Sequence, residues 1–287
     1  MRIVTTIADV RTAVRDAKSD GRAVSFVPTM GALHEGHASL FHRARKEGSF
    51  VVASIFVNPL QFNDPSDLAA YPRTAEADEA LCKSVGVDLV WRPAADTIYP
   101  ADFDTRVEPG KLAAGLEGLH RPGHFGGMAT VVLKLLNVVS PDVAIFGLKD
   151  FQQLAIVRRM VRDLDVPVKI VGCPTVREED GLAMSSRNAK LSSESRMVAT
   201  HLSRVIHAAA RAMQSGERAD RARDIALSDL SSQSAIEIEY LEVVDRDSLL
   251  PIVDERTANA VVLVAAVVGG VRLIDNVEVL PRDEESS

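Results

Sequence analysis

The sequence has few cysteines, no excess of positive charge and no long apolar run, and each shortage excludes a class of protein. Its 287 residues include two cysteines, Cys82 and Cys173, which lie far apart and in no metal-type spacing. This excludes a disulfide scaffold and indicates a reducing compartment. Asp and Glu number 40 against 33 for Lys and Arg, a net charge of -7. That balance disfavours a nucleic-acid binder driven by phosphate contacts.

No segment of the sequence is predicted to insert into a membrane. The longest apolar run, AVVLVAAVVGGV at 260–271, is bounded by Asn259 and Arg272 and is shorter than the roughly 20 residues that span a bilayer. Charges are spread through the N-terminal residues, with no apolar core of a signal peptide. Hydrophobic residues at 46% and charged residues at 25% are typical of a globular protein with a sizeable core. We expect a soluble, cytoplasmic protein with no membrane or nucleic-acid partner.

The first two-thirds of the chain alternates short β-branched runs with helical patterns. Near-continuous apolar runs, typical of strands buried on both faces of a parallel sheet, lie at 22–28, 50–58, 87–92, 142–147 and 168–172. Helix-like stretches lie at 37–47, 74–86, 128–139 and 150–164. This alternation predicts βαβ units and therefore an α/β fold with a doubly wound parallel sheet.

The pattern changes after about residue 175. Two helix-like stretches, 195–213 and 218–231, precede an alternating strand at 235–245 and apolar runs within 259–279. Gly269-Gly270 between apolar runs is a hairpin signal. We therefore expect a first domain at 1–175 and a smaller, lid-like α+β domain with an antiparallel sheet at 176–287. The terminal RDEESS is expected to fray.

Two histidines, His34 and His37, stand three apart in MGALHEGH, directly after the first strong strand. A zinc-protease helix needs histidines four apart, and Gly36 weakens a helix by roughly 1 kcal/mol, so a metal pair is disfavoured. Backbone N–H groups at a strand-to-helix turn favour an anion, and two imidazoles there could donate to phosphate oxygens. Neither a P-loop nor a dinucleotide fingerprint is present. Two exposed polar side chains at a helix start are the alternative.

Two further stretches could bind an anion. Lys149-Asp150 opens a helix, where the dipole disfavours a cation by roughly 0.3–1 kcal/mol. The lysine is therefore either simply solvated or supplied with an anionic ligand at the edge of the sheet. GLAMSSRN at 181–188 has two hydroxyls and an arginine, which can clamp phosphate or can form an ordinary solvated loop.

Two more stretches suit other roles. Asn58, Gln61 and Tyr71 lie on a long loop after a strand, where amide side chains can bind a small polar substrate. The glycine-rich stretch at 115–128 indicates close backbone packing or a mobile flap.

Together these stretches resemble the pantothenate synthetase (pantoate–β-alanine ligase) family. The matching motifs are PTMGALHEGH, SIFVNPLQF with YPRT, RPGHFGGMATVVLKLLN, FGLKDFQQL and PTVREEDGLAMSSRN, in the family's order and spacing, and the likeness extends to RLIDN near the C-terminus. The resemblance implies a Rossmann-like fold of the nucleotidyltransferase type and a homodimer. It also implies a two-step reaction with ATP and Mg²⁺, in which pantoate is adenylated with release of pyrophosphate and β-alanine then displaces AMP.

The resemblance also assigns roles by position. The residues expected at ATP are Pro28, Thr29, Met30, Gly31, Ala32, Leu33, His34, Glu35, Gly36, His37, Gly147, Leu148, Lys149, Asp150, Val176, Met184, Ser185, Ser186 and Arg187. Of these, the residues expected to act in catalysis are His34, His37, Lys149, Ser185, Ser186 and Arg187, with His37 the best candidate for proton donor or transition-state stabiliser. Those expected at the substrates are Gln61 and Gln153 for pantoate, Gln61 also for β-alanine, with Asn58 and Tyr71. No protein ligand of a metal is expected.

The chain departs from the family pattern at two positions. Leu148 stands where the family often has a glutamate or another polar residue, and Ser66 stands where a glutamate often precedes Asp67. A side-chain role at position 148 would be lost, whereas a role of the backbone N–H would be kept.

Two other functions stay open. One is a nucleotidyltransferase that moves AMP onto a phosphate-bearing acceptor, which would call for extra basic groups, whereas Asn58, Gln61 and Gln153 suit a small hydroxy acid. The other is a non-catalytic nucleotide-binding regulator, against which the presence of His34, His37 and Lys149 argues.

Overall fold

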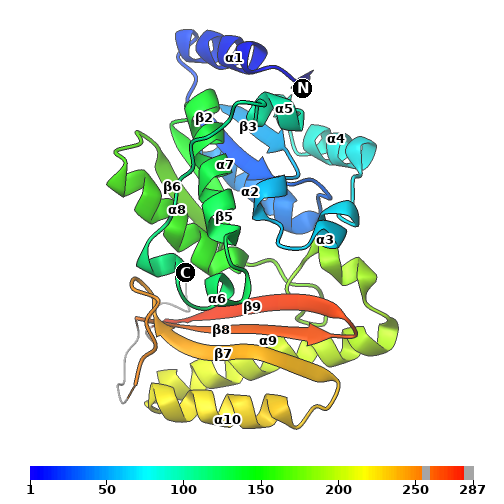
Figure 1. Cartoon of the computed structure of the whole chain (residues 1–287), viewed down its shortest axis with the longest axis vertical. Coiled ribbons are helices and arrows are strands. Elements are labelled where there is room, and N and C mark those ends of the chain that lie inside the picture. Colours follow the sequence, from blue (N-terminus) through cyan, green and yellow to red (C-terminus); the bar gives the residue numbers. More distant parts are fainter. Residues whose placement is uncertain (254–258, 281–287) are drawn as a thin grey trace. The chain divides into compact units, whose positions relative to one another are not determined.

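The computed structural model describes residues 1–253 and 259–280, so the terminal RDEESS lies outside the described residues. The chain divides into two compact units (Figure 1). The first comprises residues 1–114, 121–148 and 152–175, and the second comprises residues 115–120, 149–151 and 176–287. Among the described residues no helix is long and apolar enough to cross a membrane.

The first unit is built on a six-stranded parallel sheet in the order β1-β4-β3-β2-β5-β6. The strands are β1 (Arg2–Val4), β2 (Val24–Thr29), β3 (Phe50–Ile55), β4 (Leu89–Trp91), β5 (Val143–Gly147) and β6 (Lys169–Cys173). All five predicted strands are present, and the predicted doubly wound parallel sheet is confirmed. β1 was not predicted, because a strand of three residues leaves almost no periodicity to detect.

Helices cover both faces of this sheet. They are α1 (Ile7–Ser19), α2 (Glu35–Glu47), α3 (Pro65–Ala69), α4 (Ala75–Ser84), α5 (Ala95–Ile98), α7 (His124–Val139) and α8 (Phe151–Asp163), with single 3-10 turns η1 (Pro59–Gln61), η2 (Lys111–Ala113) and η3 (Leu148–Asp150). Neighbouring strand residues alternate between two cores: Phe26 packs with α1, α7 and α8, whereas Val27 packs with α2 and α4. Strands buried on both faces explain the continuous apolar runs.

Two helices differ from expectation. α7 begins at His124, four residues before its predicted start, and includes Gly126 and Gly127. A Cβ on Gly127 would lie 2.1 Å from the carbonyl oxygen of Leu60, so this glycine allows η1 to approach the helix. The glycine-rich stretch is therefore closely packed here. α1 was not predicted, although its buried residues recur with helical spacing.

The second unit contains a three-stranded antiparallel sheet in the order β7-β8-β9. Its elements are α6 (Glu117–His120), η4 (Ser186–Lys190), α9 (Ser193–Gln214), α10 (Ala219–Ser231), β7 (Ile236–Asp245), β8 (Ala260–Val268) and β9 (Val271–Val279). Gly269 and Gly270, both with positive φ, join β8 to β9, as the predicted hairpin requires. α9 and α10 share one apolar core with this sheet.

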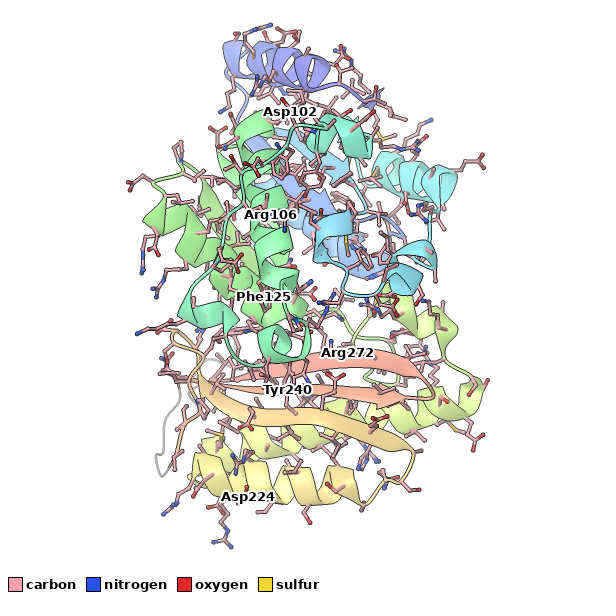
Figure 2. All side chains as sticks on the ribbon, in the orientation of Figure 1. Asp102, Arg106, Phe125, Asp224, Tyr240 and Arg272 are labelled. Atoms are coloured by element: carbon pink, nitrogen blue, oxygen red, sulfur yellow. The ribbon has the colours of Figure 1, made fainter. Side chains whose placement is uncertain are left out.

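An ion cluster of one buried and three half-buried side chains joins α6 to the sheet of the second unit; Figure 2 labels its members Arg272 and Tyr240. The Arg272 guanidinium donates to Glu117 at 2.7 Å and to Glu239 at 2.6 Å, and the Tyr240 hydroxyl donates to Glu117 at 2.8 Å. Burial and the neighbouring Glu117 charge raise the pKa of Tyr240. Burial opposes the charge of Arg272, yet the hydrogen bonds to Glu117 and Glu239 raise its pKa.

We predict that Glu117→Gln lowers the free energy of unfolding by about 1.5–3 kcal/mol, because it weakens charge-assisted hydrogen bonds between a buried carboxylate and a half-buried guanidinium. Chemical denaturation followed by fluorescence and circular dichroism measures the change. Glu237→Gln, an exposed residue on β7, serves as the control and should be within about 0.5 kcal/mol of the unchanged protein. Equal stabilities of the two variants would contradict the structural role of the cluster.

Candidate active site

The predicted nucleotide residues of the first unit lie at the carboxyl ends of two neighbouring strands. Pro28 and Thr29 end β2, Gly147 ends β5, and the two strands pair side by side. The chain runs from β2 outward to β3 and β4, then returns to β5 on the other side of β2. Open parallel sheets bind ligands outside the carboxyl ends of their strands at such a reversal. This edge is the candidate active site of the first unit.

A buried carboxylate holds the turn that follows β2. Asp78 of α4 is 2% exposed, and its Oδ2 accepts the backbone N–H of Ala32 at 3.1 Å. Its Oδ1 accepts the backbone N–H of Leu33 at 2.8 Å and the Thr74 hydroxyl at 3.0 Å. Gly31 has φ +84°, and a Cβ there would lie 2.9 Å from Asp78 Oδ2. The turn therefore has its shape because a glycine admits the carboxylate and the carboxylate satisfies two backbone donors.

The two histidines cap the helix that follows this turn. His34 is the N-cap residue of α2, and its Nδ1 accepts the backbone N–H of Gly36 at 3.1 Å. The Nδ1 of His37 accepts the backbone N–H of His34 at 3.3 Å, which completes a capping box. The ring centroids are 4.2 Å apart. His34 and His37 are three residues apart, which disfavours a zinc site of the protease type. The same separation is that of an N-cap residue and its N3 partner.

This arrangement determines which nitrogen of each ring carries hydrogen. Since each Nδ1 accepts a backbone N–H, each neutral imidazole carries its hydrogen on Nε2. His34 and His37 are thus both Nε2–H donors at the N-terminus of a helix, where the dipole also favours an anion.

Amide side chains on η1 form a second part of this edge. Gln61 is 7% exposed and donates from Nε2 to the Met30 sulfur at 3.1 Å. Asn58, 1% exposed, donates to Gln61 Oε1 at 2.9 Å and to the Gly127 carbonyl at 3.1 Å. Its Oδ1 accepts the Tyr99 hydroxyl at 2.7 Å, which keeps its hydrogen because burial raises the pKa of Tyr99. Asn58 therefore holds Gln61 in place, and its own contact with a substrate stays a prediction.

The remaining predicted substrate residues of the first unit, Gln153 and Tyr71, differ in burial. Gln152 is 4% exposed and donates to the Leu112 carbonyl at 2.8 Å, whereas Gln153 is half-buried. Tyr71 is buried edge-on against Phe62. Leu148, the departure from the family pattern, packs against the apolar core, so its side chain has no polar role.

The second unit holds the other predicted phosphate residues. Val176 and Met184 are joined by a backbone hydrogen bond of 3.0 Å, from the Met184 N–H to the Val176 carbonyl. Ser185 caps η4 by accepting the Arg187 N–H at 3.2 Å, and Ser186 begins that turn. Lys149 also belongs to this unit. The structure thus brings together the predicted residues of the 176–187 loop, while their contacts with ATP stay predictions.

Among the described residues neither cysteine is an activated nucleophile, and no cluster of metal-ligating side chains is present. Burial raises the pKa of the Cys82 thiol to about 12 and also raises that of Cys173, so neither is activated. In the part of the chain that the structure describes, no three His, Cys, Asp or Glu side chains are grouped to hold a metal ion. The site is one of positioned hydrogen-bond donors.

Comparison with known proteins identifies the family. A family model described as pantoate-beta-alanine ligase matches residues 2–278. The chain belongs to this family. Pantothenate synthetase 1 of Bradyrhizobium diazoefficiens is 50% identical over 277 residues, covering 96% of this chain and 98% of that protein. A pantothenate synthetase of Cereibacter sphaeroides is 49% identical over 277 residues, covering 96% and 99%.

Solved structures agree with this assignment. Pantothenate synthetase from Thermus thermophilus matches with a TM-score of 0.93 at 48% identity, covering 98% of this chain and all of that one. A pantoate-beta-alanine ligase from Francisella tularensis, complexed with beta-gamma ATP and beta-alanine, matches with a TM-score of 0.79 at 34% identity, covering 97% of each chain. The predicted family and enzyme class are confirmed, which decides against the non-catalytic regulator and the transferase acting on a phosphate-bearing acceptor.

Asp78, Tyr99 and His124 are functional candidates that sequence reasoning missed. His124 Nδ1 lies 2.8 Å from the Gln61 carbonyl oxygen, at the start of α7. Each of the three holds a predicted site residue through a partner distant in the chain. The sequence signals were weak: His124 lies in the quoted motif RPGHFGGMATVVLKLLN without an assigned role, and Asp78 lies in a predicted helix, where a solvated carboxylate is equally common.

We predict that Asp78→Asn lowers the free energy of unfolding by about 1–3 kcal/mol and lowers the ligase rate, because an amide cannot accept all three hydrogen bonds at the turn. Thermal melting and a pantothenate assay measure the two effects. Glu76→Gln, an exposed change on the same helix, is the control. A variant at 78 that behaves like this control would show that the carboxylate does not hold the turn.

A second prediction separates the two roles of His34. Asparagine is a good N-cap residue, so His34→Asn should keep stability within about 0.5 kcal/mol, whereas His34→Leu should lose about 0.5–2 kcal/mol. Both variants lack the Nε2–H donor, so both should lose ligase rate by about 100-fold. A full rate in His34→Asn would show that only the cap matters.

Proposed function

We propose that this chain activates the carboxylate of pantoate with ATP and joins the resulting pantoyl adenylate to β-alanine. In the first step a carboxylate oxygen attacks the α-phosphorus, the bond to the bridging oxygen breaks, and pyrophosphate leaves. In the second step the amine of β-alanine attacks the acyl carbon and loses a proton, the acyl–oxygen bond breaks, and AMP leaves. The relative from Francisella tularensis, complexed with beta-gamma ATP and beta-alanine, supports this assignment of substrates.

The observation that carries the proposal is the histidine capping box at the carboxyl end of β2. It orients two Nε2–H donors and the N-terminus of α2 without any covalent nucleophile. Adenylate formation needs donors of this kind, because negative charge builds on phosphate oxygens in the transition state. His34 and His37 therefore stabilise the phosphates, and the fixed ring positions supply alignment as well as charge.

The other residues complete the reaction by their chemistry. The Lys149 ammonium neutralises phosphate charge, and Ser185, Ser186 and Arg187 act on the leaving pyrophosphate, with the planar guanidinium suited to two phosphate oxygens. Gln61 and Gln153 bind pantoate, and Gln61 also serves β-alanine. We propose that 1–175 and 176–287 act as the two domains of a cytoplasmic homodimer.

Mg²⁺ would come with the nucleotide. The described residues present no cluster of metal-ligating side chains, which fits an ion that keeps several waters and binds through substrate phosphates. Bound there, it would neutralise phosphate charge, in addition to the donors of the chain.

Omission of each reactant in turn tests the proposal. Pyrophosphate should form with ATP, Mg²⁺ and pantoate, while AMP and pantothenate should require β-alanine as well. Coupled pyrophosphate release and chromatography of the products measure the two steps. A folded sample with no pantoate-dependent turnover would exclude this function.

His37→Ala and Lys149→Ala should each lower adenylate formation by at least about 100-fold, the effect of losing one preorganised donor. His42→Ala, exposed on the same helix as His37, and Lys46→Ala, also exposed on α2, are the matched controls and should keep the rate. Near-normal rates in both test variants would refute these roles without refuting the family.

A further inference from the structure

β9 carries two polar residues, Asp275 and Asn276, in the buried part of the second unit. They are 4% and 5% exposed. A carboxylate is seldom buried unless it is paired, and an unpaired buried amide costs free energy. Their partners therefore indicate what the two residues do.

Asp275 binds Arg177 through both of its oxygens. Arg177 Nη1 lies 2.7 Å from Oδ2 and Nη2 lies 2.9 Å from Oδ1, a bidentate pair. The backbone N–H of Asn276 also donates to Asp275 Oδ1, at 2.8 Å. The carboxylate thus fixes the guanidinium against β9.

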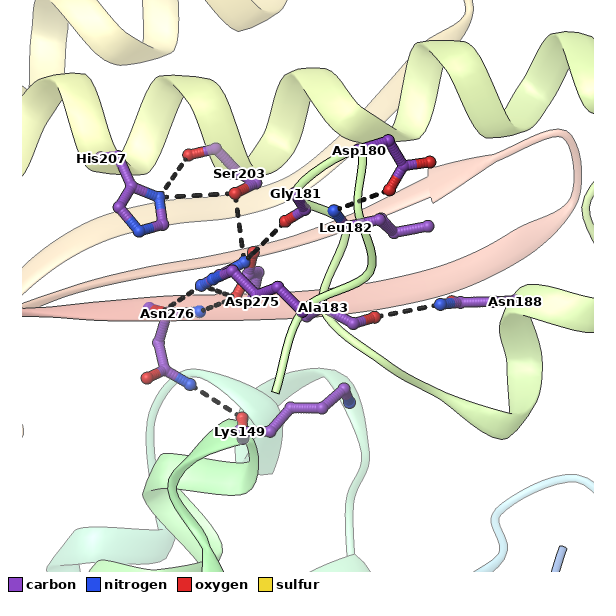
Figure 3. Close-up of polar contacts among 11 residues, drawn as sticks. Lys149, Asp180, Gly181, Leu182, Ala183, Asn188, Ser203, His207, Asp275 and Asn276 are labelled. Atoms are coloured by element: carbon purple, nitrogen blue, oxygen red, sulfur yellow. Dashed lines mark hydrogen bonds and ion pairs between the residues drawn. The ribbon is translucent and has the colours of Figure 1, made fainter. Parts of the chain in front are cut away.

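Arg177 in turn fixes the loop that precedes the predicted phosphate residues. Its Nη1 donates to the Gly181 carbonyl and to the Ser203 hydroxyl, each at 3.1 Å (Figure 3). The chain turns at Gly181 and returns to pair Ala183 with Arg177. Met184 then bonds to Val176, and Ser185 follows directly. The position of Arg177 therefore sets where the 184–187 segment begins.

Asn276 makes the corresponding contact with Lys149. Its Nδ2 donates to the Lys149 carbonyl oxygen at 2.8 Å, and Figure 3 shows the ammonium end of Lys149 directed away from this contact. The bond restrains the backbone at 149 while the side chain extends elsewhere. Residues 149–151 belong to the same compact unit as β9.

Stability alone is a weak explanation for this network. Replacing a buried ion pair by well-packed apolar residues is often neutral or stabilising, because desolvation offsets the attraction between the charges. The apolar residues of β9 share a hydrophobic core with α9, α10 and the other two strands. A positioning role explains why Asp275 contacts the 176–187 loop and why Asn276 contacts the Lys149 backbone, both of which are distant in the sequence.

We propose that Asp275 and Asn276 form a positioning pair for the phosphate-binding residues of the second unit. Asp275 acts through Arg177 on the 176–187 loop, and Asn276 acts on the backbone of Lys149. Together they hold the Lys149 ammonium in register with Ser185, Ser186 and Arg187, so that all four act on one phosphate chain. This inference rests on the proposed function for what these residues bind.

A double-mutant cycle tests the link between Asn276 and Lys149. Asn276→Leu removes the amide donor with little change of shape, and it should lower pantoate-dependent pyrophosphate formation by about 10- to 100-fold through misplacement of Lys149. In a Lys149→Ala background the same change should lower the rate by less than about 2-fold, because the group being positioned is gone. Glu278 also lies on β9 and forms an ion pair with Arg246. Glu278→Gln removes this ion pair, is the control and should keep the rate in both backgrounds.

Hydrogen exchange without substrates provides a second measurement. Backbone amides in a peptide covering 146–154 should exchange at least about 10-fold faster in Asn276→Leu, while a peptide covering 7–19 should be unchanged. If Asn276→Leu fails to fold, Asn276→Ser removes the same donor and takes its place. This measurement decides the inference even if the unchanged protein shows no pantoate-dependent turnover, an outcome that would exclude the proposed function instead.

Three results would overturn the positioning role. They are an unchanged rate in the Asn276 variant, equal fold-losses with and without Lys149, and unchanged exchange at 146–154. Equal losses would indicate a general structural effect.

Discussion

The pairing of β2 with strands on both of its sides is the constraint on which the candidate active site depends. β2 pairs in parallel with β3 along its full length and with β5 on its other side. Apolar cores cover both of its faces. A strand that is paired on both edges and covered on both faces can leave the sheet only at its ends, and the turn from Met30 to Leu33 begins at the carboxyl end of β2. The position of the helix that follows is determined by the same constraint.

The start of α2 shows how backbone donors become part of a binding site. The first N–H groups of a helix have no partner within the helix, so other groups must satisfy them. Here the Asp78 carboxylate satisfies donors of the preceding turn, and the Nδ1 atoms of His34 and His37 satisfy donors at the cap. Capping uses the Nδ1 atom of each ring, whereas the proposed contacts with phosphate would use Nε2. Under the proposed function, the requirement of the helix would therefore orient the donors that a phosphate needs.

Sequence reasoning succeeded where the signal is local. Near-continuous apolar runs predicted the five main strands, and the glycine pair at 269–270 predicted the hairpin. The three-residue spacing of His34 and His37 is also a local signal, because it is the spacing of an N-cap residue and its N3 partner in a capping box. α7 was predicted to start late because glycine disfavours helices. The close approach of Leu60, which requires Gly127, cannot be seen from the helix alone.

Apart from Asn58, the residues that hold the site could not be predicted, because their partners are distant in the chain. Asp78 is 46 residues from Ala32, Arg177 is 98 from Asp275, and Lys149 is 127 from Asn276. Spacing within a motif carries no information about such pairs. Both units nevertheless follow one rule: a predicted site residue is held by a buried polar residue whose own hydrogen bonds are made within the protein. Asn58 holds the Gln61 side chain in this way, and Asn276 holds the Lys149 backbone in the same way. The low exposed fraction of Asn58 and Asn276 reflects this supporting role.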